Sequence, residues 1–571
     1  MVGSLLVALP VVVFALVWQQ YAVNVPKWDD HALRAYLYFS DQETTLSGKI
    51  YQLFRQHNEH RIVFDRIVAA LDYRLFGKLS YVHLMVVGNL RLVGLVAVFG
   101  AVLRRAGKSL LYLVPVSLLL FNLSHWENMF WGMAALQNFS VVLWVVLTVY
   151  LLSHTNQWGL ALASAVLATL TSGNGLLVWP LGFVLLALRP VDVRSLVSRS
   201  VRWRVSPLIG WAVGAVVVIG LYFVGFEKPA GNPPLRGTAT DLLKGWLAFT
   251  GAAAEALPVI PLRASALLGG LMVGTTLGLV AWGVLTHWTT LVRLLRRMRS
   301  SRRSGFGTAQ TIPPVVLFFW GCAGFLLGTA TIVAWTRTGF GIDLLITSRY
   351  KIYSLTLLAL LYVYVVALLP AQTSRWAGMA GGLGSLLIAW LSYNAFIDET
   401  IWWRHYVLTR QFNDTHGTNQ PVSRVDAVTA KYTTLAPAFY DVNPAVLYGA
   451  GQSPVVPMTV TETPTGFTIQ QATLSVQDER DGRSFVVARS SKRTYLFPTR
   501  QNQNLTMRTR FWPANSFTNG FTAVLAPVDF DAGTYQLFVL TVSANGALTL
   551  HPTGQTIVSA GQAGMPLKKN W

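Results

Sequence analysis

Long apolar runs constrain this chain more than any other feature, because each is close to the length of a membrane-spanning helix. A helix needs about 20 mostly apolar residues to cross the hydrocarbon core of a bilayer. Hydrophobic residues make up 53% of the chain and charged residues 12%, which excludes an ordinary soluble protein. We predict a polytopic α-helical membrane protein with eleven spans, near residues 3–23, 82–103, 109–123, 138–154, 157–172, 175–188, 206–226, 265–287, 313–335, 350–370 and 378–397.

The positions of Lys and Arg predict the orientation of these spans. Basic residues collect in alternate connections, at 104–108, 189–204, 293–303 and Arg375, and such connections face the cytoplasm. The N-terminus is then cytoplasmic, the first run stays uncleaved, and everything after residue 398 is extracytoplasmic, in a bacterial plasma membrane. The loop 24–81 would lie outside although it carries eight basic residues, and its seven acidic residues indicate a folded loop. Because the excess charge of +21 lies largely in such connections, we expect no nucleic-acid partner.

The C-terminal part of the sequence changes character. Residues 398–457 resemble an extended connector, and residues 458–571 alternate short β-branched runs with turn residues, which predicts an extracytoplasmic β-sandwich. Asn545-Gly546 is a strong hairpin pattern because both positions of a type I′ turn need positive φ. We expect strands at 466–476, 484–487, 505–511, 521–525, 535–542 and 547–550, after a transmembrane module formed by residues 1–397.

Two carboxylates follow the first span directly, at Asp29 and Asp30. At the membrane surface such a carboxylate can act as a general base that takes a proton from an acceptor hydroxyl. The alternative is that both residues cap the next helix. Trp28 and His31 flank the pair and are candidates for contact with a sugar or acceptor.

A second polar stretch in the same loop, residues 56–61, lies within an amphipathic run that predicts a helix in the interface. On a helix His57, His60 and Arg61 would share one face, where they could bind a phosphate, ligate a metal or form a polar stripe. We favour phosphate, and we expect Glu59 to contact sugar or acceptor. The spacing differs from that of a zinc helix, so no metal ligand is assigned.

Two further outer groups point to sugar and phosphate chemistry. The first combines amide, acidic and aromatic side chains that suit sugar hydroxyls and ring faces, and the alternative is an interfacial aromatic belt. It consists of His125, Trp126, Glu127, Asn128 and Gln137. The second comprises Arg337, Arg349 and Lys351 at the ends of two spans. These basic residues could hold an anionic headgroup or serve as snorkelling anchors.

Ser172 to Gly175 interrupt an apolar segment, which indicates either a helical hairpin or a broken helix lining a cavity. Cys322, the single cysteine, allows no intrachain disulfide. The nucleotide-binding and hydrolase motifs with known spacing are missing where they could function.

Taken together, the spans, the acidic pair Asp29-Asp30, the juxtamembrane helices of the first loop and the C-terminal outer domain resemble the GT-C superfamily of membrane glycosyltransferases. That resemblance implies a polyprenyl-phosphate-linked sugar donor and an inverting displacement at the sugar C1. It further implies a first-loop aspartate as base, for which we favour Asp30 over Asp29, and basic residues on the lipid phosphate. The Trp-Trp-Asp tripeptide and the metal-binding carboxylates of the oligosaccharyltransferase branch are missing, so a need for Mg²⁺ or Mn²⁺ stays open. In layout alone the chain also resembles actinobacterial arabinosyltransferases, whose extra domain binds carbohydrate.

We therefore expect a glycosyltransferase that moves a sugar to an extracytoplasmic glycan, lipid or protein. Two alternatives come from other classes. A transporter or flippase for a polysaccharide precursor would need polar residues deep in the spans, for which Asn89 and Arg91 are the clearest pair. A non-catalytic scaffold would leave Asp29, Asp30 and His57 in local caps or in solvent.

Overall fold

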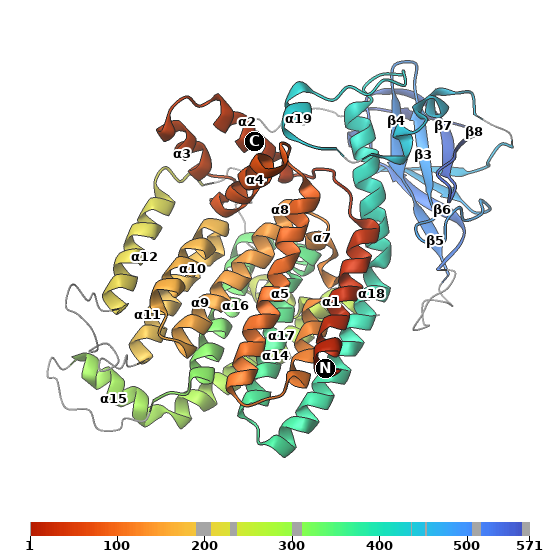
Figure 1. Cartoon of the computed structure of the whole chain (residues 1–571). Helices are drawn as coiled ribbons and strands as arrows, with labels where there is room; N and C mark the ends of the chain where they lie inside the picture. Colours follow the sequence, from red (N-terminus) through yellow and green to blue (C-terminus); the bar gives the residue numbers. More distant parts are fainter. Residues whose placement is uncertain are drawn as a thin grey trace. The chain divides into compact units, whose positions relative to one another are not determined.

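The computed structural model describes residues 2–189, 207–228, 237–257, 259–299, 311–435, 437–451, 454–504 and 516–561, with the backbone alone at 295–299. The predicted strand 505–511 and the parts 190–204 and 300–303 of the predicted cytoplasmic stretches lie outside these residues. The chain divides into two compact units (Figure 1). Unit 1 comprises Met1–Trp18, Phe39–Ala70 and His83–Ala395, and unit 2 comprises Gln19–Tyr38, Leu71–Val82 and Phe396–Trp571.

Within the described residues, eight helical segments are long and apolar enough to cross a membrane. They are Val2–Tyr21, Tyr81–Arg105, Leu110–Met129, Gly132–His154, Pro261–Thr286, Pro314–Phe340, Ser348–Leu368 and Ala371–Thr415. Three shorter apolar helical segments fill the remaining predicted windows, at Trp158–Thr171, Gly173–Leu188 and Pro207–Phe223. The eleven predicted runs are therefore all helical, and eight of them reach the length of a span.

The main helices of unit 1 pack side by side, with α9 against both α10 and α16 (Figure 1). Their bounds are α1 Val2–Tyr21, α5 Tyr81–Arg105, α6 Val114–Leu120, α7 Trp126–Met129, α8 Gly132–Ala134, α9 Ser140–His154, α10 Trp158–Thr171, α11 Val178–Leu188, α12 Pro207–Phe223, α13 Ala239–Thr250, α14 Pro261–Thr286, α15 Trp288–Arg299, α16 Pro314–Arg337, α17 Lys351–Leu368 and α18 Ala371–Thr415. Small residues allow the closest approaches. A Cβ at Gly269 of α14 would lie 1.8 Å from the Leu247 carbonyl oxygen of α13, so these helices touch through their backbones.

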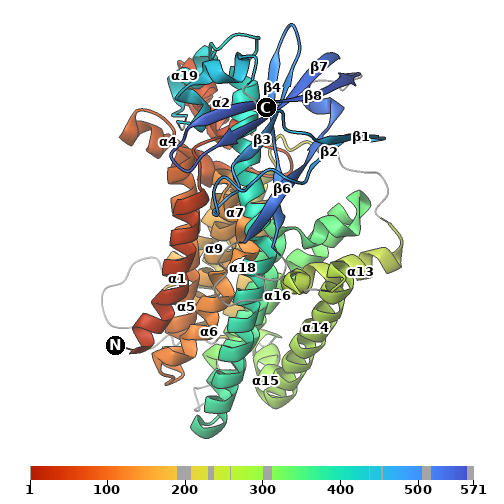
Figure 2. The ribbon, with the colours of Figure 1, turned by 90° about the vertical axis from the view of Figure 1, so that its right-hand side faces the viewer.

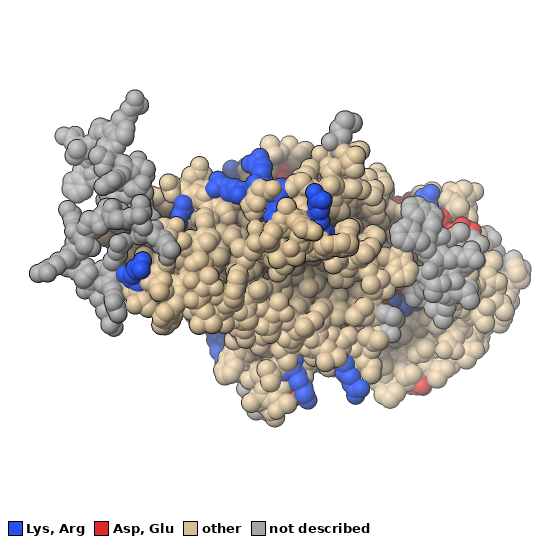
Figure 3. All heavy atoms as spheres, turned by 90° about the horizontal axis from the view of Figure 1, so that it is seen from below, with Lys and Arg blue, Asp and Glu red and all other residues tan. Residues whose placement is uncertain are grey.

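Basic residues tie several helix ends together at one end of unit 1. Arg105 at the end of α5 donates to the His154 carbonyl at the end of α9, and Lys108 donates to Leu369 after α17 at 2.7 Å. Arg189 after α11 donates to Leu152 at 2.8 Å. Two connections predicted to be cytoplasmic, at 104–108 and at Arg189, therefore both bind the end of α9, and the first also binds the residue after α17. Figure 3 looks onto this end, where visible Lys and Arg side chains outnumber those of Asp and Glu.

The Arg189 contact also shows which of the two predicted structures, a helical hairpin or a broken helix, the segment around residue 174 adopts. It brings the end of α11 beside the end of α9, where α10 starts, so the chain reverses between α10 and α11. The polar interruption is thus the tip of a helical hairpin, with a 3-10 turn at Gly173–Leu177.

Four shorter helices complete the first loop and the segment after α18. These are α2 Asp30–Gln42, α3 Leu46–Phe54, α4 Val63–Phe76 and α19 Ala427–Tyr432. The extended connector expected from residue 398 is wrong as far as Thr415, because α18 continues to that residue. Neither Gly nor Pro occurs between Ser385 and His416, and Leu408 and Phe412 are buried against strands of unit 2, which stabilises the continued helix.

The described residues of the C-terminal β region form two four-stranded sheets, and Figure 2 labels strands β1, β2 and β6 of one and β3, β4, β7 and β8 of the other. Their orders are β1-β2-β6-β5 and β4-β3-β7-β8, and every pairing is antiparallel. Ile469, Val486, Phe521 and Leu537 belong to one buried cluster that draws on both sheets. The predicted hairpin joins β7 and β8, and Gly546 has φ +84°. Asn545 does not have positive φ, so the predicted type I′ turn is wrong although the hairpin forms. The bounds are β1 Thr459–Thr463, β2 Gly466–Gln471, β3 Ser484–Arg489, β4 Thr494–Pro498, β5 Arg500–Gln503, β6 Phe517–Leu525, β7 Gly533–Val542 and β8 Leu548–Ser559.

Candidate functional site

Residues 55–62 form a turn between α3 and α4, so the prediction of a continuous helix through His57, His60 and Arg61 is wrong. The backbone N–H groups of His57 and His60 each donate to the other residue's carbonyl at 2.9 Å. Asn58 between them has φ +48°, which is outside the helical region. The three side chains therefore do not share a helix face, and each has its own environment.

Arg61 and His60 fix this turn to the rest of unit 1. The guanidinium of Arg61 donates to the Tyr222 carbonyl at 2.6 Å and to the carbonyls of Phe54 and Val224. These carbonyls lie at the ends of α12 and α3, where helices leave acceptors without an internal partner. His60 Nδ1 accepts from the Gly173 N–H at 3.1 Å. Arg61 thus has a structural use, and the ring proton of neutral His60 is placed on Nε2.

Glu59 lies at the tip of this anchored turn. The Tyr222 hydroxyl donates to the Glu59 carbonyl at 3.2 Å, and the Glu59 carboxylate forms an ion pair with Arg337. His60 Nε2 lies 3.6 Å from the same carboxylate. The first loop and the end of α16 therefore meet through Glu59, although 278 positions separate Glu59 from Arg337 in the sequence.

Each of the three predicted basic residues is paired with a glutamate. Besides Arg337, the Arg349 guanidinium lies 3.3 Å from Glu127, and Lys351 pairs with Glu255. Lys351 is 1% exposed, whereas the side chains of Arg337 and Arg349 are 29% and 33% exposed. Lys351 is thus buried, and the two arginines keep surface for a further anion.

The predicted amide and aromatic group assembles around Arg349. Asn128 donates to the Arg349 carbonyl at 3.1 Å and accepts from Asn138 at 2.8 Å. The Ser348 hydroxyl accepts from the backbone N–H of Glu127. Both Glu127 and Asn128 are buried, so these two polar residues hold the chain around Arg349 instead of lining an open sugar site.

The remaining members of this group differ in environment. His125 is fully buried with its ring edge-on to Phe139, and Trp126 is half-buried. Gln137 donates to the Thr171 carbonyl at 3.4 Å, near the α10–α11 tip. At that tip Asn174 donates to the Tyr353 hydroxyl at 2.9 Å.

An apolar cavity of about 460 Å³ lies between α13 and α16 in unit 1. Its walls come from one turn of α13 and one turn of α16, and its last α16 residue, Trp335, precedes Arg337 by two positions. The lining residues are Leu242, Leu243, Trp246, Thr331, Ile332, Ala334 and Trp335. Arg337 is not one of these lining residues, and it is near the cavity only along the sequence of α16. An apolar groove suits the apolar part of a ligand.

The predicted acidic pair belongs to unit 2 and starts α2. Asp30 is fully buried, and its carboxylate accepts from the Lys27 N–H at 3.0 Å, which holds the turn before α2. Asp29 is half-buried. Asp29 is therefore the more exposed of the two carboxylates.

Lys27 and Trp28 hold the backbone before this pair. Lys27 Nζ lies 3.0 Å from the Trp403 ring centroid and 4.1 Å from that of Trp28. Trp28 has φ +43°, an outlier for a bulky residue. Such strain persists only where the surroundings enforce it, and it is common at functional sites. Trp28 packs edge-on against Trp403 at 6.0 Å, so the cation and the two indoles enforce the conformation.

His31 follows this pair on α2. Burial lowers the pKa of His31 to about 4, and the nearby positive charges of Arg34 and Arg410 add to the effect. His31 is therefore neutral at pH 7 and could contact an acceptor only as an uncharged ring.

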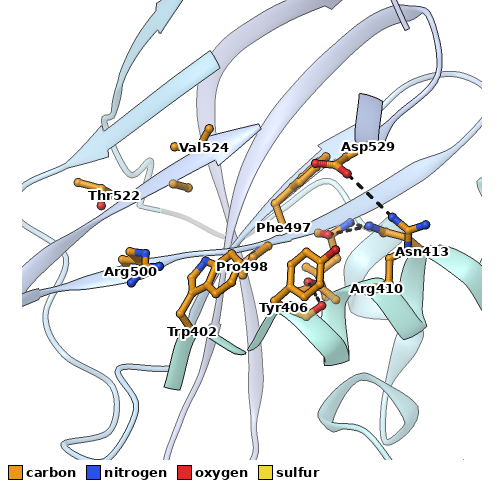
Figure 4. Close-up of a pocket in the computed structure, with 13 residues that line it drawn as sticks. Trp402, Tyr406, Arg410, Asn413, Phe497, Pro498, Arg500, Thr522, Val524 and Asp529 are labelled. Atoms are coloured by element: carbon orange, nitrogen blue, oxygen red, sulfur yellow. Dashed lines mark hydrogen bonds and ion pairs between the residues drawn. The ribbon is translucent and has the colours of Figure 1, made fainter. Parts of the chain in front are cut away.

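A second cavity, of about 310 Å³, lies within unit 2 between α18 and the strands (Figure 4). On the helix side Trp402 and Tyr406 stack at 5.1 Å. Arg500 lies over Trp402 at 4.9 Å, and Arg410 pairs with Asp529 at 3.9 Å. Stacked aromatic rings between charged groups suit a sugar ring with its hydroxyls. None of these residues was a sequence candidate.

Sequence reasoning also missed Glu255, Tyr222 and Asp65. Glu255 lies in a loop without a distinctive motif, and its pairing with Lys351 depends on the fold. Asp65 is fully buried, and burial raises the pKa of its carboxyl well above the usual range. Among the described residues, no group of three or more His, Cys, Asp or Glu side chains could hold a metal ion.

Comparisons with protein-family models, with curated proteins and with solved structures find no match to this chain.

The conformation of Asn58 can be tested by a pair of substitutions. Asn58→Ala should lower the free energy of unfolding by about 1 kcal/mol relative to Asn58→Gly, because alanine is strained at positive φ and glycine is not. Thermal unfolding of the purified protein, followed by circular dichroism, measures the difference. Equal stability of the two variants would mean that the turn does not hold residue 58 in the left-handed region.

The lowered pKa of His31 predicts a pH dependence of stability. Between pH 6.5 and about 4, His31 is protonated in the unfolded chain but stays neutral in the folded protein. Protonation therefore favours the unfolded chain, and stability is lost as the pH falls through this window. His31→Gln removes this contribution, and the variant should gain stability relative to the native chain as the pH falls. Denaturant unfolding at several pH values in this window measures the gain. A stability difference that does not change with pH would contradict the assignment.

Proposed function

We propose that this chain is a glycosyltransferase of the bacterial plasma membrane that takes its sugar from a polyprenyl-phosphate carrier. In this proposal α10, α11 and α12 also span the membrane, which gives eleven spans in a GT-C-like module. The N-terminus is cytoplasmic, and the β region is an extracytoplasmic β-sandwich. The acceptor is an extracytoplasmic glycan.

The apolar cavity between α13 and α16, whose last α16 residue lies two positions before Arg337, is the observation that carries this proposal. An isoprenoid chain is wholly apolar and its phosphate is charged, so its binding site must join an apolar groove to a cation. The groove between α13 and α16 ends two residues before Arg337, at the end of a candidate span. A phosphate on Arg337 would therefore lie at the membrane surface while its chain follows α16.

Arg337 and Arg349 are the basic residues to which we assign the phosphate. Both keep about a third of their side-chain surface, and a guanidinium can bind phosphate through two parallel hydrogen bonds. Lys351 is buried and paired with Glu255, so we assign it to the structure of the helix end. We also assign Arg61 a structural role because its guanidinium donates to three backbone carbonyls.

The reaction is a displacement at the sugar C1. The acceptor oxygen forms a bond to C1 as the bond from C1 to the phosphate oxygen breaks, and the electron pair stays on the phosphate. Guanidinium groups on that phosphate stabilise the charge that develops as it leaves. Asp29 takes the proton of the acceptor hydroxyl, because Asp30 is buried and holds the turn before α2.

The cavity of unit 2 is our candidate for acceptor binding. The stacked pair Trp402 and Tyr406 offers an apolar platform for a sugar ring, and Arg410, Asn413 and Asp529 offer polar groups to its hydroxyls. The platform supports a glycan as acceptor.

Binding of the carrier tests the donor assignment without knowledge of the sugar. Arg337→Gln should weaken the binding of polyprenyl phosphate about tenfold, since a hydrogen bond to a charged group is lost. The matched control Arg375→Gln removes the same charge from an exposed position on α18 and should change little. Native mass spectrometry of nanodisc-embedded protein measures both. Equal weakening in the two variants would show that the loss of one positive charge lowers the affinity, and that Arg337 does not bind the phosphate.

The two aspartates separate catalysis from folding. Asp29→Asn should lower sugar transfer at least about 100-fold in protein that is still folded, because a general base is lost. Asp30→Asn should lower stability by about 1 kcal/mol, because a buried charged acceptor is lost. Transfer from a bacterial extract of polyprenyl-linked sugars and thermal unfolding are the readouts. Full transfer by a folded Asp29→Asn protein would exclude Asp29 as the base.

A further inference from the structure

The ion pair of Glu59 with Arg337 differs from the other two pairs of unit 1. Both of its side chains are 29% exposed, whereas Glu127 is buried in one of the other pairs and Lys351 in the other. An ion pair that water reaches is weak, worth about 0.2 to 1 kcal/mol, because the solvent screens it. The Glu59–Arg337 pair is therefore the one that an incoming anion can open at the lowest cost.

The backbone of Glu59 is held far more firmly than its carboxylate. Arg61 binds three carbonyls, His60 accepts from Gly173, and the Tyr222 hydroxyl donates to the carbonyl of Glu59 itself. A carboxylate on a fixed turn loses little further entropy when it returns to its partner. The turn can thus release Arg337 and take it back without refolding.

We propose that Glu59 expels the lipid-phosphate product by competing with it for Arg337. The inference rests on the proposed function, and it gives a role to a carboxylate that the reaction at C1 leaves unused. In the resting protein Glu59 pairs with Arg337. The donor, a phosphodiester with one negative charge, opens the pair and takes the guanidinium.

The chemistry of the transfer explains why a competitor is needed. When the bond between C1 and the phosphate oxygen breaks, the diester becomes a monoester, and its charge rises from one toward two at pH 7. The product then binds the guanidinium more strongly than the donor did. Without a competing anion the spent carrier would stay and block the next donor. The carboxylate of Glu59, held on its fixed turn, re-forms the pair and displaces it.

If Glu59 competes with the phosphate for Arg337, its removal should strengthen the binding of polyprenyl phosphate. Removal of a residue that binds the phosphate would weaken it. Glu59→Gln should bind polyprenyl phosphate about two- to fivefold more tightly, which is the loss of a partly exposed ion pair expressed as an affinity. Polyprenol, which has the chain without the phosphate, should bind as it does to the native protein. Glu59→Asp keeps the charge and should bind like the native protein.

The control removes the same charge from a neighbouring loop. Glu227 is exposed, and its backbone N–H donates to Gln56 of the Glu59 turn at 2.9 Å. Glu227→Gln should leave the affinity for polyprenyl phosphate unchanged. Equal tightening in Glu227→Gln and Glu59→Gln would show a general electrostatic effect and overturn the proposal.

Native mass spectrometry of the nanodisc-embedded full chain, titrated with polyprenyl phosphate and with polyprenol, measures these affinities. Unchanged or weaker phosphate binding by Glu59→Gln overturns the proposal, as does equal tightening toward polyprenol. If the native protein binds no polyprenyl phosphate at all, the proposed function itself fails. The two failures are therefore distinct: the first leaves a native protein that binds the carrier, and the second does not.

Discussion

The candidate site of unit 1 depends on the carbonyl groups that helices α3 and α12 leave unpaired at their ends. A helix cannot satisfy its last carbonyls internally, and near a membrane water is a scarce substitute. Arg61 supplies donors to Phe54, Tyr222 and Val224 at once. That single side chain fixes the turn, the turn fixes Glu59, and Glu59 meets Arg337 at the end of α16.

Ion pairing and burial also distinguish the roles of residues that look alike in the sequence. Arg337, Arg349 and Lys351 are similar in type and position, yet burial makes Lys351 a part of the structure and leaves the two arginines partly open. The pair that we weighed as evidence for a transporter is accounted for in the same way. Asn89 donates to the Met129 carbonyl at 3.1 Å, and Arg91 lies over Phe64 and Trp144. These contacts give both residues a structural role.

The sequence predicted what depends on local pattern. Apolar runs predicted the candidate spans and the three shorter apolar helices, but they did not predict α13 or α15. Asn545-Gly546 predicted the hairpin between β7 and β8, where Gly546 has positive φ. Prediction failed where one residue or a distant contact decided the outcome. Asn58 in the left-handed region breaks a helix that the spacing of apolar residues favours. The continuation of α18 to Thr415 depends on burial of Leu408 and Phe412 against strands that come later in the chain. Strands β1, β4 and β5 went unrecognised, and the glutamate partners of the basic residues lie too far away in sequence for any motif to reveal.

The central claim is that unit 1 binds an isoprenoid phosphate with its phosphate on Arg337 and its chain between α13 and α16. An electron cryo-microscopy structure of the nanodisc-embedded protein with added polyprenyl phosphate tests it most directly. The account predicts phosphate density within hydrogen-bond distance of Arg337, a chain along Trp246 and Trp335, and a Glu59 carboxylate displaced from the guanidinium. Density for the carrier elsewhere, with the Glu59–Arg337 pair intact, would contradict it.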